Sequence, residues 1–90
     1  GKLENVYRLQ IMNATEATQR YRISASGLDG LEVASEQEVD IGAAESRWVA
    51  VRLQIPYGSA PPGSHAIHFD ISALESGGKV AEKSIFLVPR

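Results

Sequence analysis

The chain contains no cysteine among its 90 residues, and this absence excludes three kinds of chemistry. Without a thiol there is no disulfide, no thiolate ligand for a metal ion and no cysteine nucleophile. The absence leaves the compartment open, because a domain without cysteine folds in oxidising and in reducing surroundings alike.

The chain also lacks any long apolar run and any excess of one charge. No run approaches the ~20 residues that span a bilayer, and we expect no signal peptide within these residues. Nine basic and eleven acidic residues give a net charge of −2. This balance excludes a basic surface for nucleic acid or anionic lipid. The first residues are Gly1 and Lys2 rather than methionine, so we expect a fragment of a longer protein, with any membrane segment lying outside it.

Apolar and polar residues alternate with a period of two along most of the sequence. Residues 7–11 place Tyr7, Leu9 and Ile11 on one face and Arg8 and Gln10 on the other, which is typical of a half-buried strand. Similar runs occupy residues 19–27, 46–56, 65–72 and 81–89, with shorter ones at 31–33 and 38–41. No segment has a convincing helical pattern.

Turn residues separate these runs and set the expected fold class. The segments "NATEAT", "GLDG", "YGSAPPG" and "ESGG" are rich in residues that favour turns. Short strands at this spacing predict an all-β fold, an immunoglobulin-like antiparallel β-sandwich of about seven strands in a single domain over residues 1–90. A barrel of five or six strands is the alternative. Trp48 lies on the polar face of its strand, and we expect it to cap one end of the sandwich.

The two histidines of the chain are the first candidates for a functional site. His65 and His68 lie in "GSHAIHFDIS", residues 63–72, close to Asp70. Residues three apart on a strand point to opposite faces, so these imidazoles cannot share one ion without a bulge. His68 and Asp70 share a face, about 7 Å apart, but a structural zinc site needs four ligands. We predict solvent-facing histidines and no metal ligand, with His65 and His68 as the only candidates.

No other combination of side chains matches a known type of catalytic site. Ser64, His65 and Asp70 lack a nucleophile elbow, and sequence neighbours on a strand are not neighbours in space. The acidic residues of 36–40 resemble a charged sheet edge more than a calcium loop. Outward-facing arginines are expected to form cross-strand ion pairs, and Asn13-Ala14-Thr15 fits the glycosylation sequon. We therefore predict no catalytic and no cofactor-binding residue, and the loop 56–65 as the contact surface for a protein partner.

Several segments together resemble the C-terminal immunoglobulin-like domain of the FixG/CcoG family, the bacterial cytochrome c oxidase accessory proteins. The segments are "ENVYRLQIMNAT", "QRYRISASGLDGL", "RWVAVRLQIPYG", "PPGSHAIHFDI" and "EKSIFLVPR", which cover nearly all of residues 4–90. The order and spacing of the strands, and the "GLDGL" and "PPGSHAIHF" loops, carry the resemblance.

The resemblance implies a setting for the domain. Family members are bacterial inner-membrane proteins whose cysteine motifs bind [4Fe–4S] clusters, and they are linked to assembly of the cbb-type oxidase through copper reduction. The domain is then a non-catalytic, periplasmic docking module without a cofactor of its own. Its partner is another protein or the rest of its own chain, and the oligomeric state is open. One alternative is copper handling by His65, His68 and Met12, since imidazole and thioether bind copper. Another is an unrelated adhesion-type binding module.

Overall fold

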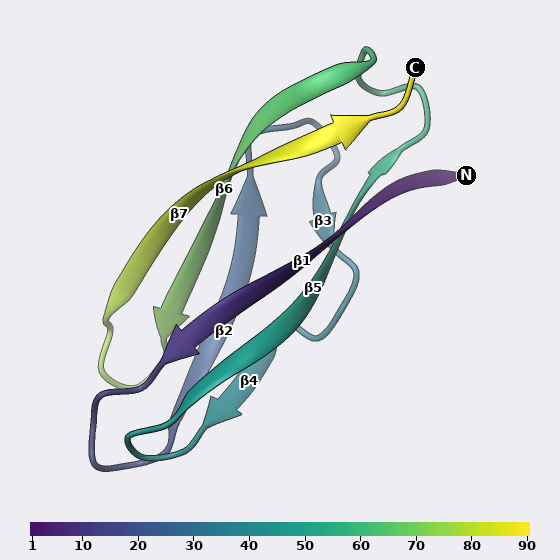
Figure 1. Cartoon of the computed structure of the whole chain (residues 1–90). Helices are drawn as coiled ribbons and strands as arrows, with labels where there is room; N and C mark the ends of the chain where they lie inside the picture. The colour runs from purple at the N-terminus through teal and green to yellow at the C-terminus, as the bar shows by residue number, and fades with distance from the viewer.

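The computed structural model describes residues 1–90, and all of its regular elements are β-strands. No helix in it is long and apolar enough to cross a bilayer. The chain forms seven strands, whose arrangement can be followed in Figure 1: β1 (Lys2–Met12), β2 (Gln19–Ser26), β3 (Glu32–Val33), β4 (Glu38–Ile41), β5 (Ser46–Pro56), β6 (Gly63–Ala73) and β7 (Lys79–Val88).

The strands form two antiparallel sheets that pack face to face. One sheet has three strands in the order β1-β5-β3, and the other has four in the order β4-β2-β6-β7. The predicted seven-stranded immunoglobulin-like sandwich is therefore confirmed, and the barrel alternative is wrong because the two sheets do not close on each other. The molecule is elongated, with a long axis of 46 Å.

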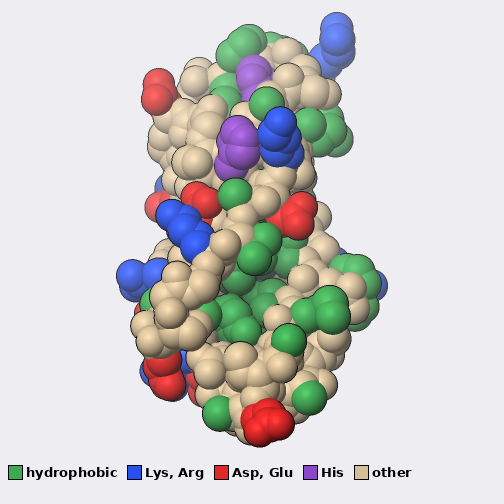
Figure 2. Space-filling model, turned by 90° about the vertical axis from the view of Figure 1, so that its left-hand side faces the viewer, with side chains coloured by type: hydrophobic (Ala, Val, Ile, Leu, Met, Phe, Trp, Pro, Cys, Tyr) green, Lys and Arg blue, Asp and Glu red, His purple; other side chains and the backbone are tan.

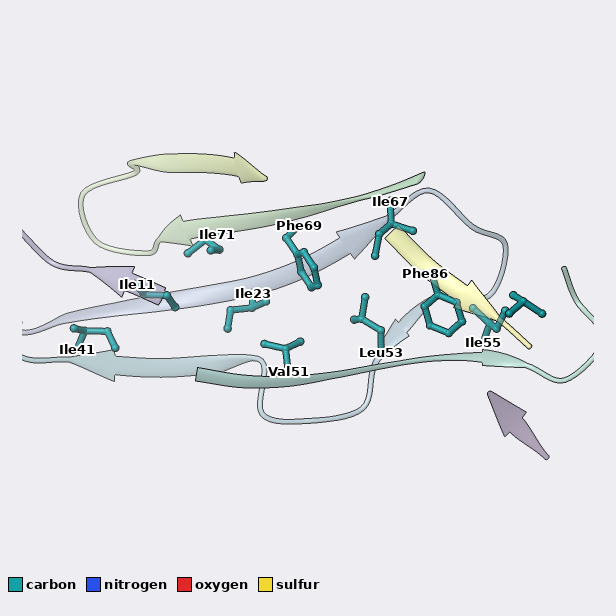
Figure 3. Close-up of a cluster of buried hydrophobic side chains, with 11 residues drawn as sticks. Ile11, Ile23, Ile41, Val51, Leu53, Ile55, Ile67, Phe69, Ile71 and Phe86 are labelled. Carbon is teal, nitrogen blue, oxygen red and sulfur yellow. The ribbon is translucent and has the colours of Figure 1, made fainter. Parts of the chain in front are cut away.

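The alternation read from the sequence sets which residues face the partner sheet. Val51, Leu53 and Ile55 of β5 are buried, whereas Arg52 between them is exposed. Long central strands supply most of the core, as Figure 3 shows. The buried hydrophobic cluster consists of Ile11, Ile23, Ile41, Val51, Leu53, Ile55, Ile67, Phe69, Ile71, Phe86 and Val88.

Phe69 is the side chain that joins the two sheets near their centre. It is 1% exposed, and its ring meets that of Tyr7 edge to face, with centroids 5.0 Å apart and an interplanar angle of 75°. Truncating a buried phenylalanine costs about 3–5 kcal/mol. That is a large share of the ~5–15 kcal/mol by which domains are stable, so this contact is a main determinant of the fold.

The segment between β2 and β5 crosses from one sheet to the other. The short strand β3 pairs with β5, and β4 then returns to pair with β2. The crossing begins in the "GLDG" turn, where Gly27 has a φ of 126°. A Cβ at Gly27 would lie 2.8 Å from the carbonyl oxygen of Ala66, so the turn requires glycine for both its conformation and its close contact with β6.

Arginines and acidic residues pair across neighbouring strands, as the sequence predicts. Arg20 bonds Asp40 at 2.9 Å, and the same two strands carry the Arg22–Glu38 pair. Arg52 of β5 contacts Glu4 of β1 at 3.3 Å. These pairs lie on the outer faces of the sheets and in solvent, where they favour the observed register more than they add stability.

Trp48 departs in part from its expected position. It faces outward on β5, as the alternation predicts, and lies opposite Gln10 of β1. The expectation that it caps one end of the core is wrong. Its ring is half exposed on the outer face of the three-stranded sheet. The guanidinium carbon of Arg8 lies 5.4 Å from the ring centroid, and this cation–π contact stabilises the ring in its outward position.

Candidate functional site

The two histidines lie on β6 and leave it on opposite faces. His65 shares its face with the buried Ile67, and its ring Nε2 lies 2.7 Å from the carbonyl oxygen of Pro61. His68 faces outward between Ser26 of β2 and Lys83 of β7. No group of three or more His, Cys, Asp or Glu side chains is placed to hold a metal ion. The structure therefore does not bring the two candidates together.

The hydroxyl and carboxylate near these histidines do not complete a catalytic group. Ser64 and Asp70 occupy even positions of β6, whose odd positions carry the core residues, so they face away from His65. The ring of His65 is engaged by a backbone carbonyl rather than by a carboxylate that would orient it. The arrangement offers no activated nucleophile.

Two of the three acidic residues of 36–40, Glu38 and Asp40, are paired at a sheet edge, and Glu36 is exposed before β4. Asp40 accepts a hydrogen bond from Arg20, and this bond, with the positive charge behind it, lowers the pKa of Asp40 below its ordinary value. Glu38 is engaged by Arg22. The carboxylates of β4 thus already have cationic partners from the neighbouring strand, which leaves them poorly suited to bind a calcium ion.

Asn13 is the one polar residue whose side chain is fully buried. Its Nδ2 donates to the carbonyl oxygens of Ala17, Ile41 and Gly42, and its Oδ1 accepts from the backbone N–H and the hydroxyl of Thr15. Asn13 and Thr15 of the sequon therefore belong to a buried hydrogen-bond network. A glycan on Nδ2 would replace a donor hydrogen of this network and is incompatible with the folded domain.

The loop 56–65 lies at one end of the sandwich and exposes an aromatic side chain. Tyr57 is 78% exposed, and the glycines on either side of the loop, Gly58 and Gly63, have positive φ angles with open space around them. Ala60 packs on the core and fixes the base of the loop. The loop therefore presents an exposed aromatic ring on an anchored support, and its use as a contact surface stays a prediction.

The edges of the two sheets meet where β1 runs beside β7, and half of this seam is closed by side chains. Asn5 of β1 bonds both backbone groups of Leu87, accepting from its N–H at 2.9 Å and donating to its carbonyl at 3.1 Å. The hydroxyl of Tyr7 donates to the carbonyl of Ile85 at 2.7 Å. Burial raises the pKa of this tyrosine. These three bonds take the place of a backbone ladder, since β1 and β7 belong to different sheets.

The other half of the seam is open and forms a groove of about 820 Å³. Its floor consists of core residues of both sheets, including Ile11, Phe69 and Ile71, and its rim carries Arg8, Lys79 and Lys83. Figure 2 shows a hollow lined by hydrophobic side chains on this side of the molecule.

Sequence reasoning did not find this groove. One signal lies in the first half of the last strand, where the inward positions hold Val80, Glu82 and Ser84 rather than a continuous set of apolar residues. The side-chain bonds of Asn5 and Tyr7 to the backbone of β7 cannot be predicted from a period-two pattern, which indicates only the face on which a residue lies.

One family model matches nearly the whole chain. The family model described as "IG-like fold at C-terminal of FixG, putative oxidoreductase" matches residues 1–89. None of the curated proteins compared with the chain matches it.

Two solved structures share the fold. The crystal structure of a FixG-related protein from Vibrio parahaemolyticus matches with a TM-score of 0.86 at 20% identity, over 96% of this chain and 79% of that chain. An extracellular fragment of EsaA from Streptococcus gallolyticus matches with a TM-score of 0.52 at 17% identity, over 97% of this chain but 24% of that chain.

Proposed function

Because the chain belongs to the family of immunoglobulin-like domains at the C-terminus of FixG, we propose that it is the non-catalytic docking domain of a membrane-bound iron–sulfur oxidoreductase. In this proposal the parent protein reduces copper during assembly of a cbb-type cytochrome c oxidase. The [4Fe–4S] clusters are held by cysteines of the parent outside these 90 residues, because this chain contains none.

The observation that carries the proposal is the exposed aromatic loop at one end of a sandwich that offers no reactive group. Tyr57 is 78% exposed on a loop anchored at its base. Aromatic side chains of this kind dominate the energetics of protein interfaces. Sandwich domains commonly act through end loops and sheet edges, and a protein partner or the rest of the parent chain fits such a surface.

The proposal places the parent in the bacterial inner membrane and this domain on its periplasmic side. The docking partner is then an oxidase subunit, a copper carrier or another part of the parent. The net charge of −2, without an excess of basic residues, favours contacts with a protein over contacts with anionic lipid headgroups.

No observation favours copper handling by this domain over docking. His65 and His68 leave β6 on opposite faces, and Met12, the third ligand considered, is a residue of β1 in the other sheet. A copper site needs its ligands convergent within a few ångströms, at about 2 Å from the metal.

Site-specific photocrosslinking in the full-length parent tests the docking proposal. A photoreactive amino acid in place of Tyr57 should give a discrete crosslink to one protein partner or to one segment of the parent. The matched control is Leu74, which is also exposed but lies in the turn at the opposite end of the sandwich (Figure 1). Equal, diffuse crosslinking from both positions would show that the loop is not a docking surface.

A further inference from the structure

The edge of β1 that faces the open groove carries free backbone groups. On either side of β1, the carbonyl of Gly1 accepts a hydrogen bond from the N–H of Tyr57, and the N–H of Asn13 donates to the carbonyl of Glu45. Hydrogen-bonded positions alternate along an antiparallel pair, so the odd residues of β1 direct their N–H and C=O groups toward β5. The even residues, among them Gln10 and Met12, therefore direct theirs away from the sheet. No strand pairs with β1 on that side.

The inward face of β7 beside this edge lacks a cover. Val80 lies in register with the buried Ile71, and Glu82 lies in register with the buried Phe69. Both β7 residues thus occupy the face that points into the sandwich. Val80 is nevertheless 54% exposed, because the side-chain bonds that join β1 to β7 lie only in the closed half of the seam. No strand of the three-stranded sheet covers this part of β7.

We propose that the groove binds, as an eighth strand, the segment of the parent chain that directly precedes residue 1. The family is defined by a domain at the C-terminus of FixG, so further chain precedes this domain in FixG. About a fifth of the Vibrio parahaemolyticus FixG-related chain lies outside the region that matches the present fold, which leaves room for an additional strand.

The position of the N-terminus fixes the direction of the added strand. The chain begins at the end of the molecule away from the groove (Figure 1), so a preceding segment must turn back at Gly1 to reach it. It then runs antiparallel to β1 and pairs with its free edge. A strand as long as β1 with a hairpin turn of roughly 2–5 residues covers the distance.

The groove also sets the chemistry of the added strand. Alternate side chains that point inward meet Ile11, Phe69 and Val80, which favours apolar residues, whereas a position opposite the inward Glu82 should be polar or basic. Three cations, Arg8, Lys79 and Lys83, and one carboxylate, Glu82, stand around the groove, which favours acidic residues in the remaining positions. A strand held in this way fixes how the domain is oriented on the parent.

Hydrogen exchange compares residues 1–90 with the same chain extended by about 25 preceding residues of the parent, enough for a strand of this length and its turn. The amides of Gln10 and Met12 should exchange at least tenfold more slowly in the extended chain. The amides of Glu38 and Asp40 serve as internal controls. The carbonyl oxygen of Gln37 accepts a hydrogen bond from Ile23 of β2, so the odd residues of β4 direct their backbone groups toward β2 and the even residues direct theirs away from it. The exchange rates of these two free-edge amides should not change.

A pair of substitutions on β7 separates the groove from general stability. Val80→Glu should lower the Tm of the extended chain by about 5 °C more than that of residues 1–90, because it opposes the added strand. Ile85→Glu changes a residue of similar exposure on the outward face of β7 and should affect both chains equally.

Three results would overturn the proposal. In one, Gln10 and Met12 exchange equally fast in both chains. In another, Val80→Glu lowers both Tm values equally. In the third, protection rises with protein concentration and sedimentation shows a dimer, which would make a second copy the occupant of the groove.

Discussion

At the scale of the residue, the buried Asn13 has the most specific role in the structure. The sequence marks it only as the first residue of a glycosylation sequon, in the turn segment after the first predicted strand. The structure instead uses all of its hydrogen-bonding capacity to join the loop after β1 to the turn between β4 and β5. Its role depends on three carbonyls that tertiary folding brings together, so the sequence alone could not reveal it.

Asn13→Ala should destabilise the domain by about 3 kcal/mol, because it leaves several buried backbone groups without partners. Urea unfolding measures the change as a lower midpoint with an unchanged slope. Gln10→Ala is the matched control, an exposed amide on the preceding strand β1 whose loss should cost less than ~0.5 kcal/mol. Equal midpoints for Asn13→Ala and the wild type would contradict the assigned role.

The histidines illustrate the opposite case, in which residue types and spacing were informative. Period-two alternation places His65 and His68 on opposite faces, and in the structure they leave β6 in that way. What the alternation could not provide is the contact between the His65 ring and the carbonyl of Pro61, since the conformation of the loop before β6 sets it.

At the scale of the element, strands and their faces follow from the sequence, whereas edges do not. Long alternating runs such as residues 46–56 became β5 with the expected inward residues. The edge relations of β1 and β7 depend on how the two sheets pack. The side-chain bonds of Asn5 and Tyr7 and the groove beyond them therefore emerge only in three dimensions.

The pairing of β4 with β2 should respond to pH through Asp40. Its hydrogen bond with Arg20 holds the pKa of Asp40 below the ordinary value of 3.8. The unfolded chain therefore takes up this proton first as the pH falls. The stabilisation is present above about pH 4 and is lost as the pH falls through the lowered pKa of the folded state.

Urea midpoints of the wild type and of Asp40→Asn between pH 6 and pH 2.5 test this effect. The wild type should be the more stable at pH 6, and the difference should shrink below pH 3.8 as Asp40 is protonated. Glu36→Gln, an exposed neighbour without an ion pair, should show no such trend. A difference that stays constant over the whole range would contradict the pairing.

At the scale of the whole molecule, the domain is an elongated sandwich with different features along its length. One end carries the exposed loop of Tyr57, and the groove between β1 and β7 opens beyond the closed half of the seam. The fold and the family were predictable, because strand order and loop motifs span nearly the whole chain. The loop 56–65 as a docking surface stays a prediction, and its partner was not predictable, because the alternation describes the interior and leaves the surface chemistry unspecified.

The central claim is that this domain docks and that the chemistry belongs to the rest of the parent. The most direct measurement compares the purified parent with and without residues 1–90, at equal cluster content, for reduction of Cu(II), and compares the two in cells for oxidase assembly. The account predicts that copper reduction is retained within twofold while oxidase assembly falls. Loss of copper reduction from a truncated parent that keeps its clusters would contradict it.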